Sequence, residues 1–192
     1  MKKLLFFILA LIGIATSFAF QVDSNSLDTK YPIIPTPQKI TYGNSETNFS
    51  TFFIDNSGFD RETELLTSFL VKQGLTENNN GLKIKFIQKE ISENDSDEAY
   101  SLNINDSITI TARTNKGVFY AIQTIKQIFR MERNWGVLPQ LSIIDWPAFK
   151  IRGLMHDTGR NYQSLAQLKE QIEVLALYKY NVFHWHLTDN PG

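Results

Sequence analysis

Cysteine is absent from this chain of 192 residues. Its absence excludes disulfide bonds, thiolate zinc sites, cysteine nucleophiles and a lipid anchor on an N-terminal cysteine. A strong excess of charge is also missing, since 19 Lys and Arg residues and 20 Asp and Glu residues leave a formal net charge of -1. Because nucleic-acid-binding proteins usually carry a basic patch, this balance argues against a nucleic-acid partner. The hydrophobic content of 42% is that of an ordinary globular protein.

The long hydrophobic run of this sequence lies at its N-terminus. A pair of lysines precedes an apolar run over residues 4–15, and small residues follow at Ser17 and Ala19. This pattern predicts a secretory signal peptide over residues 1–19, cleaved after Ala19, and then a polar leader over residues 20–30. An uncleaved anchor is the alternative, but the run is shorter than the ~20 residues of a membrane-spanning helix. We therefore expect a periplasmic or secreted protein without a stable membrane anchor after cleavage.

Residues 31–146 are predicted to form an α+β domain with its own core. Apolar residues at helical spacing predict helices over 61–73 and 118–129. Alternating or β-branched runs predict strands over 40–42, 49–54, 82–86, 100–104, 107–112 and 140–144. The first two of these strands flank a polar turn, and the strands 100–104 and 107–112 are expected to pair as an antiparallel hairpin. The segment Asp145-Trp146-Pro147 marks the end of this domain.

Residues 147–192 have the order strand, loop, helix, strand, which is one βαβ unit. The first strand ends at Asp157, and Ser164 with Gln167 forms a capping box that begins the helix. The second strand ends at Asp189 and is apolar enough to be covered on both faces. Polar residues gather where both strands end, as they do in (β/α)8 barrels. This order predicts the start of a TIM barrel, truncated after about two strands.

Charged residues follow the first predicted barrel strand and end the second. The planar guanidinium of Arg160 could hold two adjacent hydroxyls or a carboxylate, or it could form a structural ion pair with Asp157. Asp157 is expected to hold the loop 158–160 by side-chain hydrogen bonds. Asp189 could accept hydrogen bonds from sugar hydroxyls, orient a histidine, or cap a following helix. These side chains belong to one rim of the predicted barrel.

Two histidines on the second strand allow a different chemistry. His184 and His186 are two residues apart, so they lie on one face of a strand, with Trp185 on the other. An inward-facing pair of this kind could ligate a metal, or both rings could be buried and hydrogen-bonded. The sequence shows no third ligand, and no metal site is assigned.

Two linked motifs resemble glycoside hydrolase family 20, the exo-acting β-N-acetylhexosaminidases. The first motif runs from Arg152 to Tyr162, and the second from His184 to Asn190. Upstream, residues 34–38 and 114–124 resemble the small α+β domain that precedes the barrel in that family. The similarity extends over residues 31–192 and is closest to bacterial members.

The resemblance implies roles for particular residues. Arg160 matches the arginine that binds hydroxyls of the non-reducing sugar, and Asp189 matches an aspartate in a supporting carboxylate–histidine network, to which Asp157 and His186 are also assigned. Asn190 stands where the family often has a second aspartate. The family mechanism is substrate-assisted: the 2-acetamido oxygen attacks the anomeric carbon, an aspartate orients that amide, and the adjacent glutamate protonates the leaving oxygen. This Asp-Glu pair is expected downstream of Gly192.

The resemblance therefore predicts a β-N-acetylhexosaminidase that acts on glycans ending in N-acetylglucosamine or N-acetylgalactosamine, with no cofactor. No catalytic residue is assigned within the chain, because its adjacent pair Asp97-Glu98 lies in an acidic loop of the first domain. The 192-residue chain is expected to be inactive alone, and residues 147–192 to be unstable alone, since a barrel removes its strand edges only by closing. The alternatives are a metal-dependent barrel hydrolase using His184 and His186, or a non-catalytic secreted carbohydrate-binding remnant.

Overall fold

The computed structural model describes residues 31–55, 58–132 and 136–188. The predicted signal peptide, the polar leader and Asp189 lie outside these residues. The described part contains an α+β region up to Asp145 and a βαβ segment after it. None of its helices is long and apolar enough to cross a membrane.

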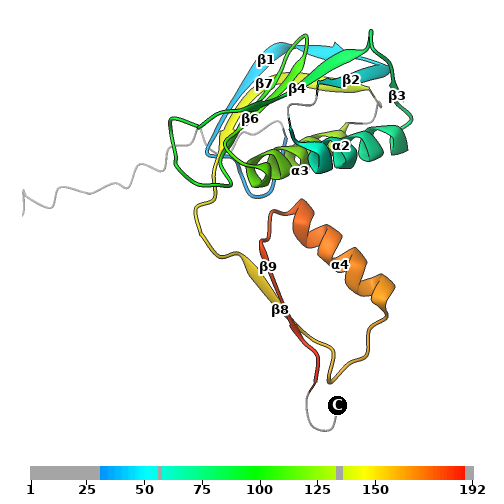
Figure 1. The fold of residues 1–192 in the computed structure, drawn as a ribbon, viewed down its shortest axis with the longest axis vertical. Coiled ribbons are helices and arrows are strands. Elements are labelled where there is room, and N and C mark those ends of the chain that lie inside the picture. The colour runs from blue at the N-terminus through cyan, green and yellow to red at the C-terminus, as the bar shows by residue number, and fades with distance from the viewer. Residues whose placement is uncertain (1–30, 56–57, 133–135, 189–192) are drawn as a thin grey trace, which may run out of the picture. The chain divides into compact units, whose positions relative to one another are not determined.

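A seven-stranded mixed sheet is the central element of the α+β region (Figure 1). Its strands are β1 (Lys39–Asn48), β2 (Thr51–Asp55), β3 (Thr76–Glu77), β4 (Leu82–Gln88), β5 (Tyr100–Ile104), β6 (Ile108–Ala112) and β7 (Val137–Asp145). Their order across the sheet is β1-β7-β5-β6-β4-β2-β3. The predicted antiparallel hairpin is confirmed, since β5 pairs with β6 from Tyr100↔Ala112 to Ile104↔Ile108.

The predicted polar turn between β1 and β2 is wrong. The polar residues after Tyr42 continue β1, which pairs with β7 through an irregularity between Tyr42 and Glu46. β2 instead pairs in parallel with β3 and β4, toward the other edge of the sheet. Backbone pairing with β7 supplies the hydrogen bonds, so this stretch stays extended despite its polar side chains.

Two helices lie on one face of the sheet (Figure 1). These are α2 (Asp60–Lys72) and α3 (Asn115–Met131), and both confirm the predicted helices to within a few residues. Gly74 follows α2 with a φ of +84°, the left-handed conformation that ends many helices. α3 packs against β5 and β6, and residues such as Ile122 and Ile125 are fully buried in the core beneath the sheet.

The βαβ segment contains β8 (Gly153–Asp157), α4 (Leu165–Leu177) and β9 (Val182–His186). β8 and β9 pair in parallel, with Gly153 opposite Val182 and Asp157 opposite His186. The capping box is confirmed, because the Ser164 hydroxyl accepts from the Gln167 backbone N–H, while the Gln167 side chain accepts from the Ser164 N–H.

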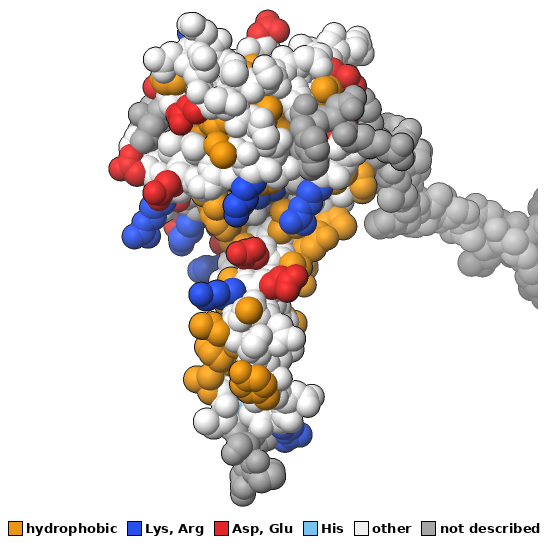
Figure 2. Space-filling view, turned by 90° about the vertical axis from the view of Figure 1, so that its right-hand side faces the viewer, with side chains coloured by type: hydrophobic (Ala, Val, Ile, Leu, Met, Phe, Trp, Pro, Cys, Tyr) orange, Lys and Arg blue, Asp and Glu red, His pale blue; other side chains and the backbone are white. Residues whose placement is uncertain are grey.

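The apolar residues of this segment are less covered than the sequence predicts. On α4, Leu168 and Leu177 are buried, but Leu165 is 63% and Ile172 46% exposed. β9 is not covered on both faces, since Trp185 is 41% exposed. Figure 2 shows hydrophobic side chains on the surface of this lower part of the molecule. In the described part of the chain, α4, β8 and β9 have too few neighbouring elements to cover both faces of the β8–β9 sheet.

Candidate functional site

The carboxyl ends of β8 and β9 lie side by side and form the candidate rim, defined as Asp157, Thr158, Arg160 and His186. Parallel pairing places Asp157 opposite His186. The Thr158 backbone N–H donates to the His186 carbonyl oxygen over 3.0 Å, and the Thr158 hydroxyl is 3.3 Å from the same oxygen. The loop after β8 is thereby tied to the end of β9.

Asp157 holds this loop in the way that the sequence suggests. Its Oδ1 accepts from the backbone N–H of Gly159 at 2.9 Å and of Arg160 at 3.3 Å. Its Oδ2 lies 3.7 Å from Nε of Arg160. The Arg160 side chain is 77% exposed. The ion pair therefore orients a guanidinium that solvent, and hence a ligand, can reach.

The two histidines of β9 share a face, as the two-residue period requires, but their environments differ. His184 is exposed, while His186 is half-buried and its Nε2 lies 2.5 Å from the Thr188 carbonyl oxygen. Trp185, on the other face, donates from its indole N–H to the Thr158 hydroxyl at 2.8 Å. Within residues 31–188, apart from the gaps named above, no group of three His, Asp or Glu side chains could hold a metal ion. The position of Asp189 relative to His186 lies outside the described residues.

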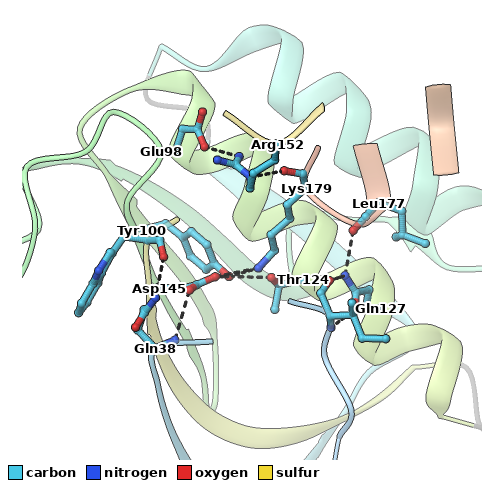
Figure 3. Close-up of polar contacts among 11 residues, drawn as sticks. Gln38, Glu98, Tyr100, Thr124, Gln127, Asp145, Arg152, Leu177 and Lys179 are labelled. Carbon is cyan, nitrogen blue, oxygen red and sulfur yellow. Dashed lines mark hydrogen bonds and ion pairs between the residues drawn. The ribbon is translucent and has the colours of Figure 1, made fainter. Parts of the chain in front are cut away.

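A buried polar network lies near the amino ends of β8 and β9, at the opposite end from the rim. The sequence did not predict it. Lys179, between α4 and β9, is only 5% exposed. Its Nζ donates to Asp145 Oδ2 at 2.8 Å and to Tyr100 Oη at 2.9 Å. The Tyr100 hydroxyl donates to the same Asp145 oxygen at 3.0 Å and lies 2.7 Å from Thr124 Oγ1 (Figure 3). This network joins the α+β region to the βαβ segment.

Burial shapes the protonation of this network. Desolvation raises the pKa of the Tyr100 hydroxyl well above its ordinary value, and the neighbouring Asp145 charge raises it further. Desolvation lowers the pKa of Lys179, while the Asp145 carboxylate opposes that shift. The ammonium, the carboxylate and the neutral tyrosine contact one another directly, so each charged group has two polar partners within the network in a buried site.

A second set of contacts surrounds the starts of β8 and β9. Arg152 forms an ion pair with Glu98, and its Nε donates to the Lys179 carbonyl oxygen at 2.7 Å. Its guanidinium also lies over the Tyr120 ring, 5.4 Å from the centroid. Asn181 donates to Glu98 Oε1 at 3.0 Å. Glu98, one half of the adjacent acidic pair in the sequence, thus lies at the amino ends of the strands and away from the rim.

Gln127 of α3 adds a contact to the end of α4. Its Nε2 is 2.8 Å from the Leu177 carbonyl oxygen and 2.7 Å from that of Ile34, as Figure 3 shows for Leu177. The sequence signal for this junction was weak, because lysine, glutamine and arginine are usually solvent-exposed. One signal was available: Lys179 follows the helix where glycine is the usual residue.

Comparison with known proteins identifies the family to which this chain belongs. The sequence model of the family described as glycosyl hydrolase family 20, domain 2, matches residues 30–146. The sequence model of the catalytic domain of the same family matches residues 149–192. The fold is thus that of the domain that precedes a glycoside hydrolase barrel, followed by the start of the barrel. The chain belongs to glycoside hydrolase family 20, which confirms the resemblance and the fold class inferred from the sequence.

Individual relatives agree with this assignment. The chain is 43% identical over 100 residues to beta-hexosaminidase 1 of Coccidioides posadasii, a match that covers 50% of this chain and 17% of that protein. It is 42% identical over 95 residues to the N,N'-diacetylchitobiase of Vibrio harveyi, covering 49% of this chain and 11% of that protein. The chain therefore spans less than a fifth of the length of these relatives.

A solved structure extends the match across the fold. The exo beta-N-acetylglucosaminidase of Vibrio harveyi, in complex with N-acetylglucosamine, superposes with a TM-score of 0.71 at 30% identity. The match covers 87% of this chain and 27% of that chain.

Proposed function

We propose that the protein to which this chain belongs is an exo-acting β-N-acetylhexosaminidase. It removes terminal N-acetylglucosamine or N-acetylgalactosamine residues from the non-reducing ends of glycans. The observation that carries the proposal is the candidate rim, where an exposed Arg160 is oriented by Asp157 at the carboxyl end of a family 20 barrel strand. The carboxyl ends of barrel strands are where such enzymes place their active sites.

The residues of the rim divide the work of holding the sugar. The guanidinium of Arg160 donates to adjacent hydroxyls of the non-reducing sugar, since its fork matches two acceptors at once. Asp157 fixes the loop that carries Arg160, and His186 and Asp189 belong to the supporting network. The Thr158 contact to His186 supports this division, because it links the loop directly to β9.

The reaction itself requires groups outside this chain. In the proposed mechanism the 2-acetamido oxygen attacks the anomeric carbon as the glycosidic bond breaks, and a glutamate protonates the leaving oxygen. The glutamate and its neighbouring aspartate are proposed to lie on a later barrel strand, downstream of Gly192. The 192-residue chain would then be inactive alone. Residues 1–19 are proposed to direct the protein to the periplasm or the exterior.

The test is hydrolysis of 4-nitrophenyl N-acetyl-β-glucosaminide by the full-length gene product. The matched control substrate is 4-nitrophenyl β-glucoside, which lacks the acetamido group. We expect hydrolysis of the first substrate only, and no turnover by residues 1–192. Hydrolysis of both substrates at similar rates would contradict the substrate-assisted mechanism, and loss of activity on chelation would favour the metal-dependent alternative.

A further inference from the structure

We infer that Lys179 is a positioning residue that anchors the βαβ segment to the α+β region. This anchor sets the residues at which β8 and β9 begin, and so keeps the rim residues on the same face. The importance of the rim rests on the proposed function. The anchoring itself rests on the geometry of Lys179 and its neighbours alone.

The backbone of Lys179 ends α4 in a conformation that is uncommon for lysine. α4 ends with the paired hydrogen bonds of a Schellman motif, from Lys179 N–H to the Ala176 carbonyl and from Tyr180 N–H to the Leu175 carbonyl, both at 3.0 Å. Lys179 has a φ of +62°, in the left-handed region where glycine is favoured. At the corresponding point after α2, this chain has Gly74. A lysine in this conformation is strained, so a compensating role of its side chain explains its presence.

The Lys179 ammonium reaches across the junction and contacts both Asp145 at the end of β7 and Tyr100 of β5. Long cationic side chains are almost never fully buried unless they are paired. Removal of one member of a buried pair leaves the other as an uncompensated charge. The ammonium therefore fixes the end of α4 to the α+β region.

The contacts around Lys179 carry this constraint to both strands. The Lys179 carbonyl accepts from Arg152 Nε, just before β8. The Arg152 carbonyl accepts from the N–H groups of Asn181 at 2.9 Å and Val182 at 3.2 Å, where β9 begins. Asn181 Oδ1 accepts in return from the Arg152 N–H at 2.9 Å. A slip by one residue would turn every side chain of a strand to its other face, Asp157 or His186 included.

The experiment compares Lys179→Gly with the wild-type 192-residue chain by residue-resolved hydrogen exchange. Glycine relieves the backbone strain but removes the anchor. We expect exchange at Leu154 and Phe183 to become at least about tenfold faster, while the α+β core at Ile110 keeps its rate. Lys169→Ala, at an exposed lysine of α4, is the matched control and should leave all rates unchanged. Unchanged or slower exchange in β8 and β9 of Lys179→Gly would overturn the inference, because a residue that only ends the helix would be improved by glycine.

A second pair of variants keeps the test decisive if Lys179→Gly does not fold. Lys179→Met leaves Asp145 buried and unpaired, whereas Lys179→Met combined with Asp145→Asn leaves no buried charge. We expect faster exchange in β8 and β9 in the single variant than in the double variant. Exchange at the wild-type rate in both variants would show that the ion pair is not the anchor. Since hydrogen exchange requires no catalysis, these results are independent of whether the proposed activity is found.

Discussion

The α+β region and the βαβ segment both carry apolar residues on their helices and strands, but they differ greatly in how far those residues are buried. β5 and β6 each bury alternate residues completely, and α3 buries nearly every side chain on the sheet side. In β8 and β9 no residue is buried, and after Asp145 the buried residues of the described chain are Leu168, Leu177 and Lys179. A pattern thus predicts which face is apolar, but burial depends on what packs against that face.

The largest expected difference between the two regions is in how much the truncation of an apolar side chain lowers the free energy of unfolding. Phe86 is 1% exposed and packs edge-on against Phe59. Phe86→Ala should lower the free energy of unfolding by about 3–5 kcal/mol, because it leaves a cavity in a closed core. Leu165→Ala, at an exposed position of α4, should change it by less than about 0.5 kcal/mol. Urea denaturation measures both, and equal effects would refute the contrast.

At the rim, the expected effect is on activity rather than on stability. In the full-length protein, Arg160→Ala should lower kcat/KM for the aryl N-acetylglucosaminide about 100-fold, since charge-assisted hydrogen bonds to the sugar are lost. Arg130→Ala, at an exposed arginine of the α+β region, is the control and should have no effect. Unaltered kinetics in Arg160→Ala would mean that Arg160 serves only its ion pair with Asp157.

The close packing of the α+β region can be tested at a glycine. A Cβ on Gly117, in the first turn of α3, would lie 2.4 Å from the Ala99 carbonyl oxygen and 2.7 Å from the Ala112 Cβ. Gly117→Ala should therefore destabilise the chain by about 1–3 kcal/mol, although alanine is the better helix former. Thermal unfolding measures the change, and an increase in Tm would show that this contact can relax.

A smaller loss of stability is expected when the helix caps are removed. Ser164→Ala removes the hydroxyl that accepts from the Gln167 N–H, and should cost about 1 kcal/mol. Thr114→Ala removes the equivalent cap of α3, where Thr114 Oγ1 accepts from the Lys116 N–H at 3.2 Å. Helicity and urea denaturation should show that Thr114→Ala lowers stability globally, while Ser164→Ala mainly frays α4. Identical responses would argue against separate stabilities of the two regions.

Local chemistry made much of this fold predictable. The antiparallel hairpin across Asn105, the stop after α2 at Gly74 and the capping box at Ser164 each depend on residues close in sequence. The continuation of β1 was not predictable from its polar residues, because its partner β7 lies far along the chain.

The contacts around the candidate site also differ in how far the sequence could predict them. The hydrogen bonds of Asp157 to its own loop followed from adjacency, whereas the Lys179–Asp145–Tyr100 network joins residues up to 79 positions apart. The residues next to Lys179, which include Tyr178 and Tyr180, do not indicate which distant carboxylate it contacts. Its unusual place after α4 was the available indication.

Hydrogen exchange of the wild-type 192-residue chain tests the comparison between the two regions most directly. We expect amides of β5 and β6 to exchange only through global unfolding, and amides of β8 and β9 to exchange faster. Within β8 and β9, residues next to the Lys179 anchor should be better protected than those at the rim. Equal protection of both sheets would refute this difference, because it would show that the βαβ segment is as stable as the closed core before it.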